Sequence, residues 1–178
     1  MAELEKVGPF PAGAEPDEYD RRRRRVLWSL PTGLYVLGSC AGGRRNLMTL
    51  NWATQVATDP KVVAVSVESG AVTRDLVERG GVFSLSILRR DDRAVVRKFV
   101  KPLEDTGDPD SLAGHPVHAA VTGAPILHQA AGWLDCRVIE RTAWDSHTVF
   151  FGEVVDCGEA DVSGELLRME DTRMSYGG

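Results

Sequence analysis

The 178-residue chain lacks any long apolar run, because no stretch approaches the ~18 residues that a membrane-spanning helix needs. Its N-terminus has neither a basic start nor an apolar segment, so we expect no signal peptide. Cysteine is scarce: Cys40, Cys136 and Cys157 are far apart and form no CxxC arrangement. These absences predict a cytoplasmic protein with reduced thiols.

The motifs of several large enzyme classes are also missing. The sequence contains no GxxxxGK[ST], no GxGxxG after a strand, no GxSxG and no HExxH. Their absence argues against P-loop, Rossmann, α/β-hydrolase and zincin chemistry. His115 and His118 have a spacing that can hold a metal, but Pro116 lies between them and no Cys or carboxylate partner is close. We interpret them as a loop pair and expect no metal site.

The residues that are present are typical of one globular domain, with 43% hydrophobic and 26% charged residues. A net charge of −5 gives no overall attraction for nucleic acid or an anionic membrane, and we expect neither as a partner. The run Arg21–Arg25 suggests nucleic-acid binding, yet acidic residues within i,i+4 reach favour a solvated helix face. We expect an irregular N-terminal arm over residues 1–16 and a single domain over residues 17–178.

Short strands dominate the pattern after residue 33. Strands are predicted at 34–40, 46–55, 61–68, 82–88, 132–144, 147–159 and 164–170. Helices are predicted from Asp17 to the stop at Pro31, over 69–81 with Ser69 or Gly70 as cap, and over 90–101. Residues 103–124 are acidic and rich in Gly and Pro, which is typical of a surface excursion. Short strands joined by tight turns predict an antiparallel barrel.

The predicted strand 46–55 carries an unusual number of hydrogen-bonding side chains. They are Asn46, Thr49, Asn51, Trp52, Thr54 and Gln55. Such groups can form hydrogen bonds with the edge of a planar ring that is rich in N and O atoms. The helix start after Ser69, with the Thr73 hydroxyl and a charge from Lys98, can hold a phosphate. Together they describe a mononucleotide-like cofactor, and a partly exposed edge strand explains the same residues equally well.

Six segments resemble the flavin reductase-like family of FMN-binding split-barrel proteins in their order and spacing. They are TGLYVLGS, NLMTLNWATQVATDPKVVAVSVE, GVFSLSIL, VRKFV, GAPILHQAAGWLDCRV and DSHTVFFGEVVD. NLMTLNW is closer to the ferric-reductase and flavoredoxin branch than to the branch with a small-residue and serine version. The resemblance implies a mainly β fold, an antiparallel, Greek-key-like split β-barrel with two or three inserted helices.

The resemblance also implies a site for FMN, with FAD as an alternative. Carried over by position, the cofactor-binding candidates are Asn46, Met48, Thr49, Asn51, Trp52, Ser66, Val67, Glu68, Thr73, Lys98 and Phe99. Thr73 matches the phosphate region of the family, and Lys98 with Phe99 matches its helix contact. His147 matches the histidine of the family's GDH motif, near the nicotinamide, with Ser146 as a departure beside it. A structural cap that bonds a turn carbonyl is the alternative role for His147.

The implied activity is that of an NAD(P)H:flavin oxidoreductase. It would pass hydride from NAD(P)H, as co-substrate, to flavin and on to free flavin, a monooxygenase component or a ferric acceptor. A nicotinamide that stacks on the flavin needs no GxGxxG motif. The family implies a homodimer with flavin near the interface, to which Trp28, Trp133 and Tyr176 could contribute. A flavoprotein electron carrier and a flavin-binding or storage protein without turnover remain as alternatives.

Overall fold

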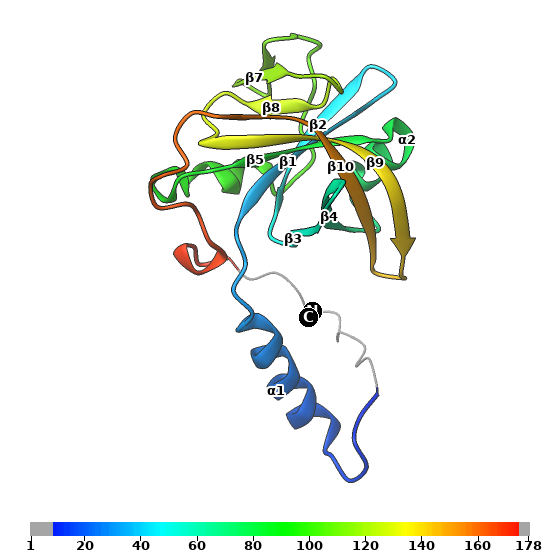
Figure 1. Ribbon diagram of the computed structural model, residues 1–178. Helices are drawn as coiled ribbons and strands as arrows, with labels where there is room; N and C mark the ends of the chain where they lie inside the picture. The colour runs from blue at the N-terminus through cyan, green and yellow to red at the C-terminus, as the bar shows by residue number, and fades with distance from the viewer. Residues whose placement is uncertain (1–8, 175–178) are drawn as a thin grey trace.

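The computed structural model describes residues 9–174, which form a barrel from which one helix projects (Figure 1). The α-helices are α1 (Pro16–Trp28) and α2 (Val72–Gly80). The strands are β1 (Tyr35–Ala41), β2 (Arg44–Leu50), β3 (Ala53–Thr58), β4 (Lys61–Glu68), β5 (Val82–Ile87), β6 (Ser111–Leu112), β7 (His115–Ala119), β8 (Pro125–Leu127), β9 (Gly132–Ala143) and β10 (His147–Glu159). Short 3-10 helices are η1 (Arg90–Asp92), η2 (Val95–Phe99) and η3 (Met169–Asp171). The predicted mainly β class is therefore confirmed.

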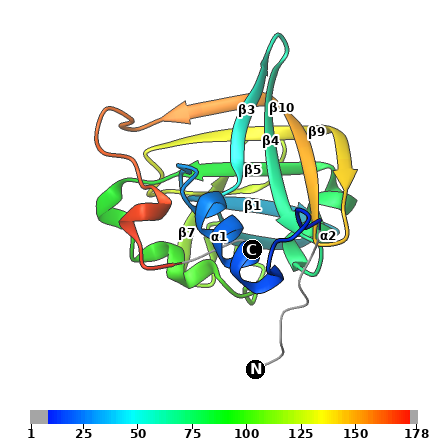
Figure 2. The ribbon, with the colours of Figure 1, turned by 90° about the horizontal axis from the view of Figure 1, so that it is seen from below.

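The strands form two antiparallel sheets, one with the order β2-β1-β5-β9-β10-β4-β3 and one with the order β6-β7-β8. β2 and β3 are the two edges of the larger sheet, yet they are consecutive in the chain and are joined only by Asn51 and Trp52. The larger sheet therefore bends until its edges come together, so that β3 and β4 cross over β1 and β5 (Figure 2). This closure makes the barrel.

The corner at Asn51 and Trp52 corrects the prediction of a single strand over 46–55. The Ala53 N–H donates to the Asn51 carbonyl at 3.2 Å, and the Ser66 N–H donates to the Trp52 carbonyl at 3.0 Å. Both halves have strand-forming residues, and no Gly or Pro separates them. Asn51 is the only residue of the corner that commonly forms turns, and it is not enough to mark the corner in the sequence.

The barrel interior is one of two hydrophobic cores. It is filled by Leu37, Leu50, Val63, Val65, Val67, Val77, Phe83, Leu85, Cys136 and Phe150. The second core lies between the larger sheet, η2 and the smaller sheet, and is built from Leu34, Val36, Leu47, Leu88, Val96, Phe99, Leu112, Val117, Leu127 and Leu167. Two cores account for β1 and β2, whose side chains are buried on both faces over much of their length.

Strand β5 alternates as predicted, but both of its faces are buried. The Ser84 hydroxyl donates to the Pro125 carbonyl at 2.6 Å, and the Leu127 N–H donates to the Ser86 hydroxyl at 3.2 Å. The polar residues of β5 therefore bond the smaller sheet to the barrel. In a half-buried strand the same residues would face water. These bonds satisfy two buried hydroxyls that would otherwise be costly.

Two predicted elements after β5 were wrong. The helix expected over 90–101 is split into η1 and η2, because Val96 and Phe99 both face the core and a three-residue spacing matches the period of a 3-10 helix. The strand expected over 164–170 makes only two isolated bridges, Gly33 to Arg168 and Arg89 to Leu166, before η3 begins. Each bridge joins a different segment, so no continuous ladder forms.

Helix α2 ends as predicted but begins differently. Gly81 follows its last turn with a φ of 66°, which glycine adopts without strain. The N-cap is Ala71, which makes no side-chain cap bond, so the prediction of Ser69 or Gly70 was wrong. The Ser69 N–H instead donates to the Ser146 carbonyl at 2.9 Å. Ser69 thus joins the α2 entry to the β9–β10 turn.

Helix α1 confirms the predicted N-terminal helix and stands apart from the barrel (Figure 1). The Glu15 carboxylate accepts the Glu18 N–H at 2.9 Å and closes the first turn. Asp20 pairs with Arg23 at 2.6 Å and with Arg24 at 3.1 Å, as the charge spacing suggested. Within residues 9–174, no helix has the length and apolar character to cross a membrane.

Candidate functional site

The end of β4, the start of β10 and the turn between β2 and β3 meet at one end of the barrel. His147 opens β10 and lies opposite Glu68, the last residue of β4. The ring of Trp52 lies 4.9 Å from the imidazole of His147, centroid to centroid, with the planes inclined by 54°. Ser66 holds the Trp52 carbonyl from β4. We call Trp52, Ser66, Glu68 and His147 the corner cluster.

The corner cluster is only partly buried. Trp52 is 38% exposed and Glu68 is exposed, whereas Ser66 and His147 are half-buried. Burial lowers the pKa of His147 below its ordinary value, and the charge of Glu68 partly opposes that shift. The imidazole is therefore neutral at pH 7, with Nδ1 3.0 Å from the Ser146 hydroxyl.

The backbone, rather than the His147 side chain, closes the turn before β10. The Trp144 N–H donates to the His147 carbonyl at 2.8 Å. Among residues 9–174, the imidazole makes no hydrogen bond to a turn carbonyl, which a capping role requires. A side chain with a ring contact and one hydroxyl neighbour is thus available to a ligand.

Arg74 is a candidate that was not predicted from the sequence. It lies in the first turn of α2, where the Nε–H is 3.4 Å from the Thr148 hydroxyl, next to His147. Its guanidinium also pairs with Asp75 at 3.1 Å and with Glu78 at 3.3 Å. The segment SGAVTR ends on this arginine, so a basic residue beside the predicted phosphate site was visible in the sequence.

Polar residues of β2 form a contrasting group, which is buried and internally bonded. The Asn46 side chain donates to the Thr73 hydroxyl at 2.8 Å and accepts the Leu103 N–H at 2.9 Å. The Thr49 hydroxyl donates to the Val96 carbonyl. The Arg45 guanidinium pairs with Asp105 at 2.7 Å. We call Arg45, Asn46 and Thr49 the β2 anchor, because they hold α2, η2 and the loop after η2 against the sheet.

The remaining cofactor candidates occupy different environments. Val67 and Phe99 are fully buried, and Phe99 packs edge-on to the His115 ring with 4.9 Å between centroids. Met48 is half-buried against the barrel core, and Asn51 is half-buried at the corner. Lys98 is exposed on η2. The structure therefore leaves few of the eleven candidates with side-chain groups that face outward.

A groove opens at the barrel mouth, and one of its lining residues, Ala53, directly follows Trp52 in the chain. Its volume is about 350 Å³. It is lined by Tyr35, Ala53, Thr54, Gln55, Lys61, Val62, Val63, Leu85, Ile87, Leu134, Val154 and Cys157. The lining is mostly apolar and begins at Ala53, next to Trp52. We call it the barrel-mouth groove.

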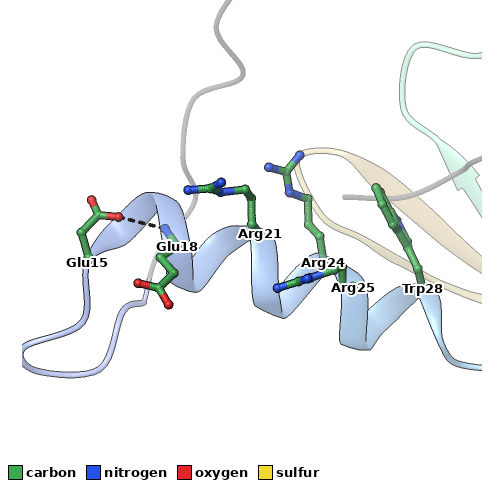
Figure 3. Close-up of a pocket in the computed structure, with 6 residues that line it drawn as sticks. All are labelled: Glu15, Glu18, Arg21, Arg24, Arg25 and Trp28. Carbon is green, nitrogen blue, oxygen red and sulfur yellow. Dashed lines mark hydrogen bonds between the residues drawn. The ribbon is translucent and has the colours of Figure 1, made fainter.

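A larger hollow of about 610 Å³ runs along α1. Figure 3 shows the side chains that line it, Glu15, Glu18, Arg21, Arg24, Arg25 and Trp28. All of these belong to α1 or its cap, and none is one of the eleven cofactor candidates. We therefore do not assign the flavin site to this hollow despite its size.

Other residues singled out in the sequence lie away from the corner cluster. His118 contacts His128 and Trp133, with ring centroids 4.9 Å and 5.6 Å away, while His115 packs on Phe99. Within residues 9–174, no group of three His, Cys, Asp or Glu side chains could hold a metal ion. The three cysteines are unpaired. Tyr176 lies outside the described residues.

Comparisons with known proteins agree with this architecture. Residues 27–176 match the family model for the flavin reductase like domain. NADH-dependent FMN reductase AsuE2 of Streptomyces nodosus subsp. asukaensis is 27% identical over 158 residues, which are 87% of this chain and 82% of the relative. The chain also matches diflavin flavoproteins of Nostoc and Synechocystis, but spans only about a quarter of their length.

Solved structures show the same fold. The NADH:FAD oxidoreductase SgcE6 of Streptomyces globisporus C-1027 superposes with a TM-score of 0.74 at 24% identity, over 94% of this chain and 98% of that one. The styrene monooxygenase flavin reductase SMOB of Pseudomonas putida S12 gives a TM-score of 0.64 at 28% identity, over 78% and 87%. The predicted split-barrel fold is confirmed, and the chain belongs to the flavin reductase-like domain family.

Proposed function

We propose that the protein is an NAD(P)H-dependent flavin oxidoreductase that uses the corner cluster as its flavin and nicotinamide site. The observation that supports this most directly is the outward-facing pair of Trp52 and His147 beside the start of α2. Aromatic and imidazole rings suit a planar isoalloxazine, and a helix start with no side-chain cap offers N–H groups to a phosphate.

The donor set fits FMN. Trp52, Asn51 and the Ser66 hydroxyl would border the ring system, with Met48 beside them. The first turn of α2 and the Arg74 guanidinium would hold the phosphate, while the Thr73 hydroxyl, which is buried and accepts from the Asn46 amide, would fix that turn against β2. Four further candidates are buried and would stabilise the elements that carry these groups: Asn46, Thr49, Val67 and Phe99. Lys98 and Glu68 stay candidates for contacts at the rim.

When bound, the flavin supplies the hydride-accepting chemistry, and the protein's own residues position it and leave one face open. His147 would line that face and orient the nicotinamide, or hold a proton at Nε2 or Nδ1. Its lowered pKa keeps it neutral at pH 7, so it would act first as a hydrogen-bonding group.

The test is anaerobic stopped-flow reduction of the FMN-loaded protein by NADH. His147→Ala should slow flavin reduction at least tenfold, which corresponds to ~1.4 kcal/mol of barrier, while the flavin spectrum and melting temperature stay close to wild type. His128→Ala is the matched control, because His128 is exposed and lies away from the corner cluster. Reduction at the wild-type rate across NADH concentrations would remove His147 from the mechanism.

A second function is favoured by the match to diflavin flavoproteins, in which this domain is about a quarter of the chain. There the domain could hold FMN and exchange electrons with a protein partner. FMN that stays bound and is never reduced by NADH, with or without excess free flavin, would favour this carrier role over our proposal. If such FMN also exchanges no electrons, a flavin-binding protein without turnover is left.

The partners follow from the same proposal. The name of SMOB links one relative to a monooxygenase, and we propose a monooxygenase component as the acceptor of reduced flavin here. We also propose a homodimer with flavin near the subunit interface. The unpaired Cys40, Cys136 and Cys157 support a reducing, cytoplasmic compartment.

A further inference from the structure

Trp144 directly follows β9 and is 60% exposed, and the proposed function gives it no role. Among residues 9–174, no other aromatic ring stacks on its indole and no group hydrogen-bonds to the indole nitrogen. An indole combines a large flat apolar surface with one polar N–H, and such side chains are enriched at binding surfaces. Trp144 therefore offers a ligand a flat face that is largely uncovered in this part of the chain.

Three hydrogen bonds fix the turn that carries Trp144. The Trp144 N–H donates to the His147 carbonyl at 2.8 Å and closes the β9–β10 hairpin. From the side of α2, the Ser69 N–H donates to the Ser146 carbonyl at 2.9 Å, and the Ser69 hydroxyl donates to the Trp144 carbonyl at 3.4 Å. A binding residue on a fixed backbone loses less conformational freedom when its ligand binds. The turn therefore holds the indole in a defined place.

Trp144 lies on the same face of this hairpin as His147. The register pairs Ala143 of β9 with Thr148 of β10. The next pair is therefore Trp144 with His147, which the hydrogen bond between them also shows. Residues directly opposite each other in an antiparallel pair point to the same face, with Cβ atoms about 4.5–5.5 Å apart. Because the His147 ring contacts Trp52, Trp144 extends the corner cluster along one face of the barrel.

Ser69 also places Trp144 next to the proposed phosphate site. Ser69 bonds the Trp144 carbonyl and lies just before the first turn of α2, where Arg74 would hold the flavin phosphate. In a dinucleotide the chain continues from such a phosphate to a second phosphate, a ribose and an adenine. Adenine is a planar aromatic base, and bases stack on aromatic side chains through their π-faces. An exposed indole at this place therefore suits the adenylate half of a dinucleotide.

We propose that Trp144 stacks on the adenine base of a dinucleotide and so makes the site prefer dinucleotides to mononucleotides. Two dinucleotides carry that base. In FAD the adenine extends from the phosphate at α2, and in NADH it is joined to the nicotinamide that His147 would orient. FMN and reduced nicotinamide mononucleotide lack the base and do not use the indole. This inference rests on the proposed function, whose flavin and nicotinamide site it extends.

The test compares each dinucleotide with the mononucleotide that lacks only its adenylate half, in wild type and in Trp144→Ala. If the adenine belongs to FAD, the variant should raise the Kd for FAD at least about fivefold in a fluorescence titration and leave the Kd for FMN within about twofold. If it belongs to NADH, the NADH concentration that half-saturates anaerobic reduction of the FMN-loaded protein should rise at least about fivefold. The limiting rate, and half-saturation by reduced nicotinamide mononucleotide, should then stay unchanged.

Two further variants complete the experiment. Trp144→Phe keeps an aromatic ring and should restore most of the lost affinity. Ile139→Ala is the matched control, because Ile139 is a 51% exposed apolar residue of β9, and it should change no binding constant.

A selective loss for FAD, for NADH or for both supports the inference and identifies the source of the adenine. Equal losses for dinucleotides and mononucleotides would make the indole a structural or interface residue and overturn the inference. Unchanged binding of both dinucleotides in Trp144→Ala would also overturn it, but would leave the proposed function standing. A wild type that binds no flavin and shows no reduction by NADH would overturn the proposed function together with this inference.

Discussion

Trp52 of the corner cluster follows Thr49 of the β2 anchor by three residues, but the two groups differ in where their polar side chains are used. In the β2 anchor, Asn46 is 3% exposed and both ends of its amide are bonded inside the protein. In the corner cluster, Trp52 and His147 contact each other and face outward. A polar side chain on a strand can therefore either stabilise the fold or remain available to a ligand. The number of hydrogen bonds that it makes inside the protein distinguishes the two cases.

The sharpest test applies one substitution to both regions. Asn46→Leu leaves the Thr73 hydroxyl and the Leu103 N–H without a partner, and each buried polar group costs about 1–3 kcal/mol when it loses one. We expect a loss of about 2–4 kcal/mol in the free energy of unfolding, measured by urea denaturation. Asn51→Leu is the matched variant, at a half-buried position of the corner.

Asn51→Leu should instead keep the stability within about 0.5 kcal/mol and weaken FMN binding roughly 5- to 150-fold. Fluorescence titration with FMN measures the change. If Asn46→Leu and Asn51→Leu lower stability equally, or if Asn51→Leu binds FMN as tightly as wild type, the contrast between the two regions is lost.

The salt bridge of the β2 anchor should give the next largest effect. Arg45 bonds both oxygens of Asp105 and holds the pKa of that carboxyl at about 2. Because this pKa is lower than in the unfolded chain, the bridge stabilises the fold above pH 4 and the contribution is lost as the pH falls through about 2. Asp105→Asn should cost about 1–2 kcal/mol at pH 7, and less at pH 2, in thermal unfolding.

His147 offers a finer measurement in the corner cluster. Burial lowers its pKa, so its contribution to stability is complete above the pKa of an unfolded histidine and is lost as the pH falls through the lower, folded value. Glu68 raises this pKa, and Glu68→Gln should therefore lower it further. An NMR titration of the imidazole protons checks both directions. A midpoint that rises in Glu68→Gln would contradict the assigned surroundings.

The smallest effect is expected on α1. Replacing Arg22 and Arg23 with Gln removes charges that face Tyr19 and Asp20 and touch neither region. FMN binding and NADH-dependent flavin reduction should stay within twofold of wild type. Salt-sensitive DNA binding that disappears in the double variant would restore the nucleic-acid interpretation of the arginine run.

The sequence predicted the strands well where alternation or a run of valines bounded them, as in β4 and β5. It failed where the physical cause is tertiary. The corner at Asn51 and Trp52 has no Gly or Pro, and the 3-10 form of η2 follows from two buried side chains rather than from helix propensity. Ser69 looked like a helix cap, but the β9–β10 turn takes its backbone N–H.

The candidate site was predictable in part. The resemblance and the residue types pointed to Trp52 and His147, and the structure brings these two together. No pattern could reveal that Asn46 and Thr49 are bonded to α2, Leu103 and Val96, because those partners lie far along the chain. Arg74 was not predicted, although it is the last residue of the segment SGAVTR, in which the phosphate site was expected.

The order of the strands also limits how much of the barrel can fold while the chain is being synthesised. β4 finds its second neighbour only in β10, and β5 finds its own in β9, so the hairpin of residues 132–159 joins the two halves of the barrel. During synthesis, one edge of the valine-rich strand β4 has no hydrogen-bonded neighbour until that hairpin has left the ribosome. Until then the open edge of β4 can pair with another chain, so this stage of folding is the one most exposed to aggregation.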